Sequence, residues 1–137
     1  MLNPDCLFCN IINKKILAHV IYEDDQTLAF LDIMPRTSGH TLVIPKDHAP
    51  TIADLSDELV APLFLTVKKM SALLKQKLSP DGITIGMNQG RASGQEVDHL
   101  HVHLMPRWHG DGGGAIQSVV NNKPKESVEA IKKKILE

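Results

Sequence analysis

The chain has 137 residues, a length typical of one domain that can bury a substantial core. Its 15 basic and 16 acidic side chains give a formal net charge of -1, so no basic excess indicates a nucleic-acid partner. The N-terminus lacks the features of a signal peptide, and no apolar run approaches a membrane span. These features predict a cytoplasmic protein without membrane or nucleic-acid partners, whose two cysteines stay reduced.

A Cys-x-x-Cys pair, Cys6 and Cys9, lies near the N-terminus, and the apolar spacing over residues 7–12 predicts a short helix. A redox dithiol normally follows a strand, for which the five preceding residues leave little room. Two interpretations remain open. The pair is either two small buried thiols that are neighbours by chance, or half of a zinc site that needs two further ligands.

Residues 20–23 and 27–31 are two β-prone runs, and the polar residues 24–26 between them favour a turn, so we expect a hairpin. Asp32 follows the second run directly, where the chain enters a loop. A carboxylate at this position can cap the turn or accept the two hydroxyls of a ribose.

Residues 40–45 predict a third, central strand that ends at Pro45. His40 and His48 lie at its two ends. Each histidine taken singly fits an ordinary surface position, but their placement makes both candidates to converge on a site shared with another strand.

Apolar side chains recur every three or four positions from residue 60 to residue 78, which predicts a long amphipathic helix with Ser56 as a candidate N-cap. Pro62 is expected to kink or break its first turns. Residues 83–88 predict a fourth strand, and the length of the connection over residues 89–96 suits an antiparallel neighbour. Backbone N–H groups of this connection could cradle an anion, although its glycines and serine are common in any hairpin.

His99, His101 and His103 alternate with aliphatic residues, so a strand places the three imidazoles on one face and the apolar side chains on the other. A helix would scatter both sets. We expect this strand to end at Pro106. Three adjacent imidazoles in a desolvated site cannot all be protonated, and a neutral ring is a nucleophile, a base or a metal ligand. The pattern therefore predicts a functional site, in preference to an exposed strand that carries histidines by chance.

The glycines of residues 110–114 predict a mobile loop and do not form a nucleotide-binding motif, because no strand precedes them. Pro124 suits the first position of a short C-terminal helix, which is supported by Val128, Ile131 and Ile135. The expected fold is one α+β domain over residues 1–137, with about five antiparallel strands, one long helix on one face and a short helix in a C-terminal extension, residues 115–137.

The motif His99-x-His101-x-His103 resembles the signature of the histidine triad (HIT) proteins, which are nucleotide hydrolases and transferases. Residues 6–12, 30–33 and 39–46 match the family as well. The resemblance implies a catalytic triad of these three histidines, in which His101 attacks the α-phosphorus of a purine nucleotide conjugate such as a nucleoside phosphoramidate. Water would then open the nucleotidyl-histidine, so one hard displacement becomes two easier ones. By the same resemblance His103 would donate to the phosphate and the leaving group.

The resemblance also implies the substrate contacts. Asp32 would take the ribose hydroxyls, His40 would be a further substrate-binding residue, and four apolar residues would enclose the base: Phe8, Ile11, Phe30 and Ile33. The phosphate would be held by Asn88, Gly94 and Gln95. Such a pocket predicts purine preference with loose discrimination between bases. One departure is Glu96, which stands where many family members carry a small polar residue and would repel the phosphate unless it is turned away.

Some relatives, among them galactose-1-phosphate uridylyltransferases, bind zinc through a Cys-x-x-Cys, a histidine after the third strand and the first histidine of the signature. Carried over, the ligands are Cys6, Cys9, His48 and His99, a set that closes a tetrahedron around a structural metal. The resemblance further implies a homodimer, with the long helix and a strand edge as its interface.

Three other functions remain open. A dinucleoside polyphosphate hydrolase shares the nucleoside monophosphate half of the substrate. A purine nucleotide-binding module would hold the same ligand without turnover. In a mononuclear zinc hydrolase, His99, His101 and another histidine would hold a catalytic metal with an open position.

Overall fold

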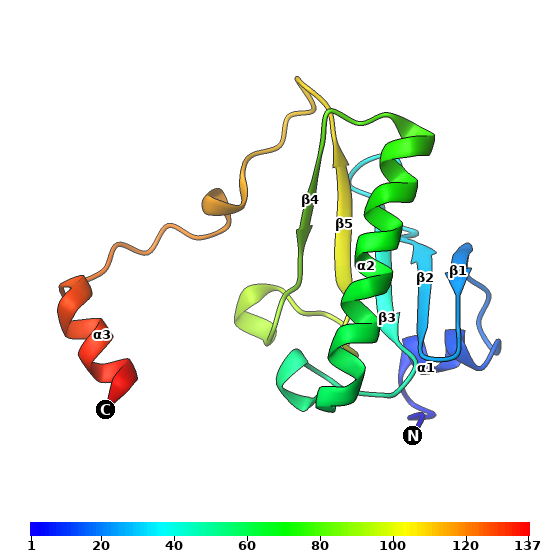
Figure 1. The fold of residues 1–137 in the computed structure, drawn as a ribbon, viewed down its shortest axis with the longest axis horizontal. Coiled ribbons are helices and arrows are strands. Elements are labelled where there is room, and N and C mark those ends of the chain that lie inside the picture. Colours follow the sequence, from blue (N-terminus) through cyan, green and yellow to red (C-terminus); the bar gives the residue numbers. More distant parts are fainter.

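The computed structural model describes all residues, from Met1 to Glu137, and builds one antiparallel five-stranded sheet in the order β1-β2-β3-β5-β4 (Figure 1). The strands are β1 (Val20–Glu23), β2 (Thr27–Leu31), β3 (Thr41–Pro45), β4 (Gly82–Gly86) and β5 (Val102–Arg107). The helices are α1 (Leu7–Ile12), α2 (Asp57–Leu78) and α3 (Val128–Leu136). The predicted α+β fold, its hairpin and its five strands are confirmed, with the fourth strand lying slightly earlier in the chain than expected.

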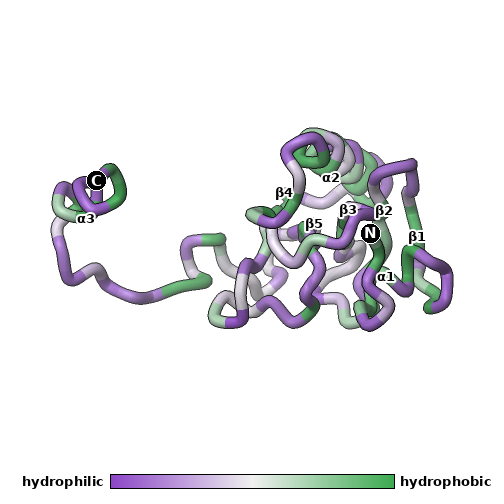
Figure 2. Tube along the Cα trace, turned by 90° about the horizontal axis from the view of Figure 1, so that it is seen from below, coloured by the Kyte–Doolittle hydropathy of each residue, from purple (hydrophilic) through white to green (hydrophobic).

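The two faces of the sheet carry separate apolar cores, because α2 covers one face and α1 the other (Figure 2). The larger core joins the apolar stripe of α2 to the sheet; it includes Leu63, Val67, Met70, Leu74, Leu100, Val102 and Leu104. The smaller core joins α1 to β2 and β3; it comprises Cys6, Phe8, Cys9, Leu28, Phe30, Leu42 and Ile44. Each fully buried aliphatic side chain contributes about 1.5–3 kcal/mol relative to exposure. The alternation of β5 thus decides which residues face α2 and which face α1.

Helix α2 runs through Pro62 without interruption, so the predicted break is absent. Proline removes only its own N–H, whose acceptor would be the carbonyl of Glu58, four residues earlier. Glu58 lies in the exposed first turn, where water can satisfy its carbonyl. Ser79 then ends the helix in a left-handed conformation with φ 51°.

Strand β5 continues through Pro106 to Arg107, so the prediction that proline ends this strand was wrong. On one side β5 pairs with β3, which starts at Thr41 opposite Leu104 and so has no residue that needs an N–H from Pro106. The carbonyl of Pro106 accepts instead from Thr37 Oγ1 at 2.9 Å. A proline is tolerated where the neighbouring strand has already ended.

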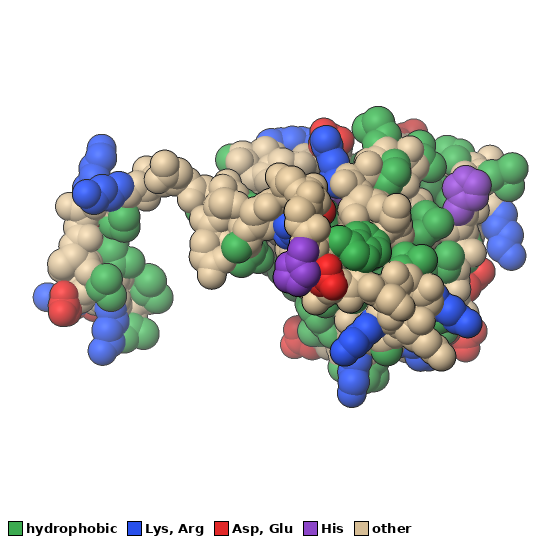
Figure 3. Space-filling view, turned by 90° about the horizontal axis from the view of Figure 1, so that it is seen from above, with side chains coloured by type: hydrophobic (Ala, Val, Ile, Leu, Met, Phe, Trp, Pro, Cys, Tyr) green, Lys and Arg blue, Asp and Glu red, His purple; other side chains and the backbone are tan.

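Residues 115–137, here called the C-terminal arm, stand clear of the rest of the molecule (Figures 1 and 3). The predicted terminal helix is present, but it begins at Val128 and not at Pro124. The N-cap is Ser127, whose hydroxyl accepts from the Ala130 N–H at 3.2 Å, and this cap sets the start of the helix. Nowhere in the chain is there a helix with the length and apolar character needed to span a membrane.

Candidate functional site

The three histidines of the motif lie on the α1 face of the sheet, as the alternation predicts. His103 belongs to β5, whereas His99 and His101 lie in the segment just before it, so the strand is shorter at its start than expected. The ring centroids of His101 and His103 are 5.0 Å apart. The intervening Leu100, Val102 and Leu104 all join the core beneath α2, which holds the histidine backbone against movement.

A hydrogen bond to a backbone carbonyl holds His101 in one tautomer. Its Nδ1 lies 2.6 Å from the carbonyl oxygen of His99, and because a carbonyl only accepts, Nδ1 carries a proton. In the neutral ring Nε2 therefore has the free lone pair. The ring is buried and packs edge-on against Phe8 at a centroid distance of 5.2 Å. This arrangement presents Nε2 of His101 as a nucleophilic nitrogen.

A chain of hydrogen bonds sets the opposite tautomer at His103. The Arg36 N–H donates to His40 Nδ1 at 3.2 Å, so the proton of a neutral His40 is on Nε2. That Nε2–H faces His103 Nδ1 at 2.9 Å, so His103 accepts there and keeps its own proton on Nε2. Burial lowers the pKa of His40 and lowers the pKa of His103 to about 4, so both rings are neutral near pH 7. His103 thus presents an N–H donor beside the His101 lone pair.

Asp32 lies next to this chain, with its Oδ2 3.7 Å from His40 Nε2. Its other oxygen, Oδ1, accepts from the Met34 N–H at 2.9 Å and so caps the turn, as one interpretation of the sequence expects. Asp32 and His40 line an open hollow of about 380 Å³ whose wall continues through residues 35–39. Gly39 closes that loop with φ +81°, a conformation that favours glycine. A carboxylate on the rim of a hollow beside the histidines is available to ligand hydroxyls.

A second cluster of donors gathers where α1 meets the segment before β5. The ligand atoms of Cys6, Cys9, His48 and His99 all lie within 4.8 Å of one another. The sulfurs of Cys6 and Cys9 are each 3.6 Å from His99 Nδ1, and Cys9 Sγ is 3.4 Å from His48 Nδ1. Tetrahedral zinc, with Zn–S about 2.3 Å and Zn–N about 2.0 Å, separates sulfur and nitrogen ligands by about 3.5 Å. The spacing of the four side chains therefore fits a tetrahedral metal.

The proton on His99 also fits a ligand role. His99 Nε2 lies 2.8 Å from the carbonyl oxygen of Pro45, which only accepts, so Nε2 carries the proton and Nδ1 directs its lone pair toward the two sulfurs. A ligating histidine commonly donates its other ring N–H to a backbone carbonyl in this way. Burial, the main cause, lowers the pKa of fully buried His99 to about 4, so the ring is neutral as a ligand must be.

A third cluster has similar side chains, but one ring nitrogen carries a proton where a metal ligand needs a lone pair. Asp32, His40 and His103 also lie within 4.8 Å of one another. Here the Arg36 N–H occupies the lone pair of His40 Nδ1, so His40 Nε2 carries a proton toward the centre of the cluster. A metal would have to displace that proton and break the backbone hydrogen bond. This cluster is therefore better described as a hydrogen-bonded chain than as a metal site.

The apolar residues expected to enclose a base are divided in the structure. Phe8 and Phe30 are buried with ring centroids 5.4 Å apart, and Ile11 packs against the same core. Ile33 is 81% exposed beside Asp32 and makes no part of that core. The three residues of the α1 core thus lie together, while Ile33 stands apart from them.

The side chain of Gln95 holds the expected phosphate-binding loop in shape through hydrogen bonds to the backbone. The Gln95 side chain is 4% exposed; its Oε1 accepts from the Gly90 N–H at 2.8 Å, and its Nε2 donates to the carbonyls of Pro50 and Val97. All of its amide atoms are in use, so Gln95 shapes the loop from within. Gly94 has φ +102°, and a Cβ built on it would lie 3.7 Å from Asn88 Nδ2. Asn88 and Gly94 are thus neighbours, as the expectation of a shared phosphate site requires.

Glu96 lies on the surface, and its backbone carbonyl accepts from Arg91 Nη1 at 2.8 Å. Arg91 also pairs with Asp98 at 2.9 Å, so one arginine bridges both ends of the segment before the histidines. Three groups that set tautomers were missed in the sequence: the Arg36 N–H and the carbonyls of His99 and Pro45. All are backbone groups, and no residue type signals them.

Comparisons with known proteins agree on one family. The HIT domain matches residues 13–110. An uncharacterized HIT-like protein of Methanocaldococcus jannaschii is 50% identical over 107 residues, which cover 78% of this chain and 82% of that protein. The adenosine 5'-monophosphoramidase hnt1 of Schizosaccharomyces pombe is 40% identical over 102 residues, 74% of each chain. The crystal structure of a HIT family member from Bacillus subtilis superposes with a TM-score of 0.85 at 36% identity, covering 96% of this chain and 95% of that one.

Proposed function

The chain belongs to the HIT family, and from this we propose that it is a nucleotide hydrolase that cleaves purine nucleoside monophosphate conjugates, such as nucleoside phosphoramidates, through a nucleotidyl-histidine. The observation that carries the proposal is the pairing of two opposite tautomers. His101 offers a lone pair on Nε2, and His103, 5.0 Å away between ring centroids, offers a proton on Nε2. A relative with a phosphoramidase name supports this choice of substrate class.

In the first step, His101 Nε2 forms a bond to the α-phosphorus while the bond from phosphorus to the leaving group breaks. The electron pair of that bond goes to the leaving atom, toward which His103 donates its Nε2–H hydrogen bond, and the leaving group takes up one proton as it departs, as an amine in the case of a phosphoramidate. In the second step, water forms a P–O bond and the P–N bond breaks. The lone pair returns to His101, and a nucleoside monophosphate and a proton are released.

Asp32 and the α1 core supply the proposed binding contacts. Asp32 would accept the ribose hydroxyls from the rim of its hollow, while Phe8, Ile11 and Phe30 of the α1 core and the exposed Ile33 would contact the base. Asn88 and Gly94 would hold the phosphate through the loop. The amide of Gln95 contacts phosphate only if it gives up its own loop contacts, so its proposed contribution is to shape that loop.

We also propose that Cys6, Cys9, His48 and His99 hold a structural zinc ion. When bound, zinc would tie α1 to the segment before β5 without contacting the phosphate. Phe8, which packs edge-on against His99 and His101, lies on α1 between the two cysteines and would be positioned by it. A cytoplasmic location fits this proposal, because thiols stay reduced there.

A homodimer built on the free edge of β4 and on α2 completes the proposal. Strand β4 has no charged residue, proline or bulge to protect its free edge, features that monomeric proteins commonly use. Among the alternatives, a catalytic zinc at His101 is not favoured, because neither cluster of potential metal ligands includes His101.

The proposal is tested by rapid quenching with a radiolabelled adenosine phosphoramidate. We expect label on His101 during turnover, up to one equivalent per chain, and release of AMP. His101→Ala should show neither, while it keeps nucleotide binding by calorimetry. Nucleotide binding by the wild-type protein without label or AMP would instead identify a binding module. Activity only on dinucleoside polyphosphates would favour the alternative hydrolase.

A further inference from the structure

The segment of residues 96–99, which leads into the nucleophile, has an unequal set of backbone hydrogen bonds. None of its four N–H groups has an acceptor within the chain, whereas the next one, that of Leu100, donates to the Ala49 carbonyl at 2.7 Å. The carbonyls are better supplied, because three of them accept from side chains: those of Glu96, Val97 and His99. Consecutive backbone N–H groups without an acceptor are donors that can bind an anion. The segment therefore offers N–H groups to a ligand directly before His101.

One side chain, Arg91, satisfies the carbonyls at the start of this segment. Arg91 begins the short 3₁₀ turn Arg91–Ser93, and its Nη1 donates to the carbonyl oxygens of Gln95 and Glu96 at 2.7 and 2.8 Å. Its Nη2 donates to Asp98 Oδ2 at 2.9 Å. We call these three contacts the Arg91 clasp. A planar guanidinium can donate to several acceptors at once, whereas a lysine ammonium is a compact point charge on a flexible stem.

The clasp also sets the charge around the free N–H groups. Residues 88–99 include two carboxylates, Glu96 and Asp98, and Arg91 is the one arginine or lysine among them. Both carboxylates oppose an incoming phosphate, and the guanidinium, which pairs directly with Asp98, offsets one of them. The side chains of Arg91 and Asp98 are 64% and 65% exposed, and an ion pair this exposed adds little to the free energy of unfolding. Loss of the clasp should therefore disturb the loop and leave the fold intact.

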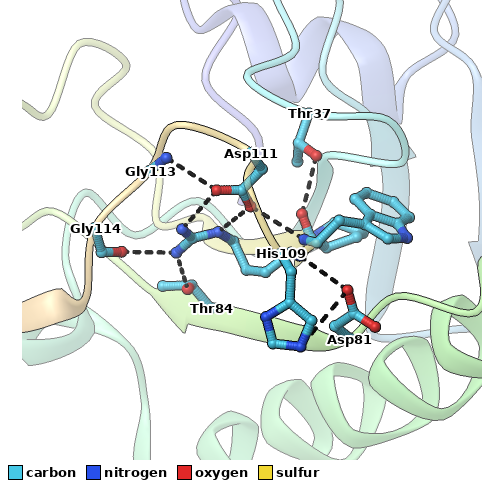
Figure 4. Close-up of polar contacts among 10 residues, drawn as sticks. Thr37, Asp81, Thr84, His109, Asp111, Gly113 and Gly114 are labelled. Atoms are coloured by element: carbon cyan, nitrogen blue, oxygen red, sulfur yellow. Dashed lines mark hydrogen bonds and ion pairs between the residues drawn. The ribbon is translucent and has the colours of Figure 1, made fainter.

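A second arginine, Arg107, makes a similar set of contacts at the far end of β5 (Figure 4). It donates to both carboxylate oxygens of Asp111, at 2.7 and 3.0 Å, and its Nη1 donates to Thr84 Oγ1 and to the Gly114 carbonyl. The loop of residues 110–114, expected to be mobile, is therefore anchored to β4 and β5. Strand β5 has 6 residues, and at a rise of about 3.3 Å per residue its length separates Arg107 from the segment before β5. Arg107 thus provides a matched control for Arg91.

We propose that Arg91 is a positioning residue for the phosphate of the substrate. By occupying the carbonyls of Gln95 and Glu96, the clasp keeps the N–H groups of residues 96–99 available to the phosphate oxygens beside His101. Arg91 acts through the loop and does not itself contact the phosphate, because its guanidinium is already engaged. This inference rests on the proposed nucleotide hydrolase and adds to it a residue that determines affinity for the phosphate and not for the nucleoside.

The test compares AMP with adenosine, which lacks the phosphate, by calorimetry on the full chain. We expect Arg91→Met to weaken AMP binding at least about tenfold and adenosine binding less than about twofold, because charge-assisted hydrogen bonds shape only the phosphate loop. Arg107→Met should leave the ratio of the two affinities unchanged. An unchanged ratio in Arg91→Met, or an equal loss for both ligands, would overturn the proposal. A wild-type protein that binds neither ligand would overturn the proposed function, and the clasp with it.

Two further measurements separate the clasp from simple charge. Arg91→Lys keeps the charge but has one nitrogen for three acceptors, so we expect AMP binding to stay at least about fivefold weaker than in the wild-type protein. Full recovery in this variant would show that charge alone is sufficient, contrary to the proposal. In the wild-type protein, AMP should slow amide hydrogen exchange of residues 96–99 at least about tenfold, and adenosine should not. Equal exchange with both ligands would show that these N–H groups do not bind the phosphate.

Discussion

The contact between His40 and His103 allows a sharp test of how the site places its protons. His40→Phe keeps a flat ring at a position that is 4% exposed, but removes the N–H that His103 Nδ1 accepts at 2.9 Å. It also removes the acceptor of the Arg36 N–H. A buried polar group left without its partner costs about 1–3 kcal/mol, so we expect a loss of about 2 kcal/mol in the free energy of unfolding. Freed from its donor, His103 can change tautomer, and turnover should fall about tenfold to a hundredfold.

Two measurements check this prediction. Nitrogen chemical shifts of labelled histidine should show His103 protonated on Nε2 in the wild-type protein and a mixture of tautomers in His40→Phe. Release of AMP from an adenosine phosphoramidate reports the change in rate. His40→Gln is the matched control, because its amide can still donate to His103, and it should recover most of the rate. A wild-type His103 that carries its proton on Nδ1 would refute the reasoning, whatever the rates.

Other predictions follow from the same structure. His101→Ala should lower turnover at least about a hundredfold, a loss of about 3 kcal/mol in transition-state stabilisation, measured as kcat/KM with the labelled substrate. The protein purified without added metal should contain about one zinc per chain by elemental analysis, and Cys9→Ser should contain none. Burial holds the pKa of His103 at about 4, so the unfolded chain binds a proton that the folded chain excludes as pH falls from about 6.5 to about 4. The free energy of unfolding by urea should therefore decrease over that window, and less so in His103→Asn. Leu104→Ala, at a fully buried position between α2 and the sheet, should cost about 2–5 kcal/mol by the same method.

Much of the site is determined by local periodicity. The alternation of histidines and aliphatic residues separates the two faces of β5, and the apolar stripe of α2 selects the face with Leu100, Val102 and Leu104. Local periodicity could not predict where the helices and strands end. Pro106 lies within β5 because β3 stops short of it, a fact about a neighbouring strand that is distant in sequence.

The sequence by itself determined the composition of this protein's site: three histidines in phase on one strand face, a cysteine pair near the N-terminus and two histidines at the ends of β3. Only the tertiary structure decided how these groups are divided. His99 joins the cysteines and His48 because the Pro45 carbonyl takes its Nε2–H and leaves the Nδ1 lone pair toward the sulfurs, whereas His103 joins His40 because the Arg36 N–H makes His40 Nε2 a donor. Backbone groups exist at every residue, so their effect on a distant ring depends on the fold and not on residue type.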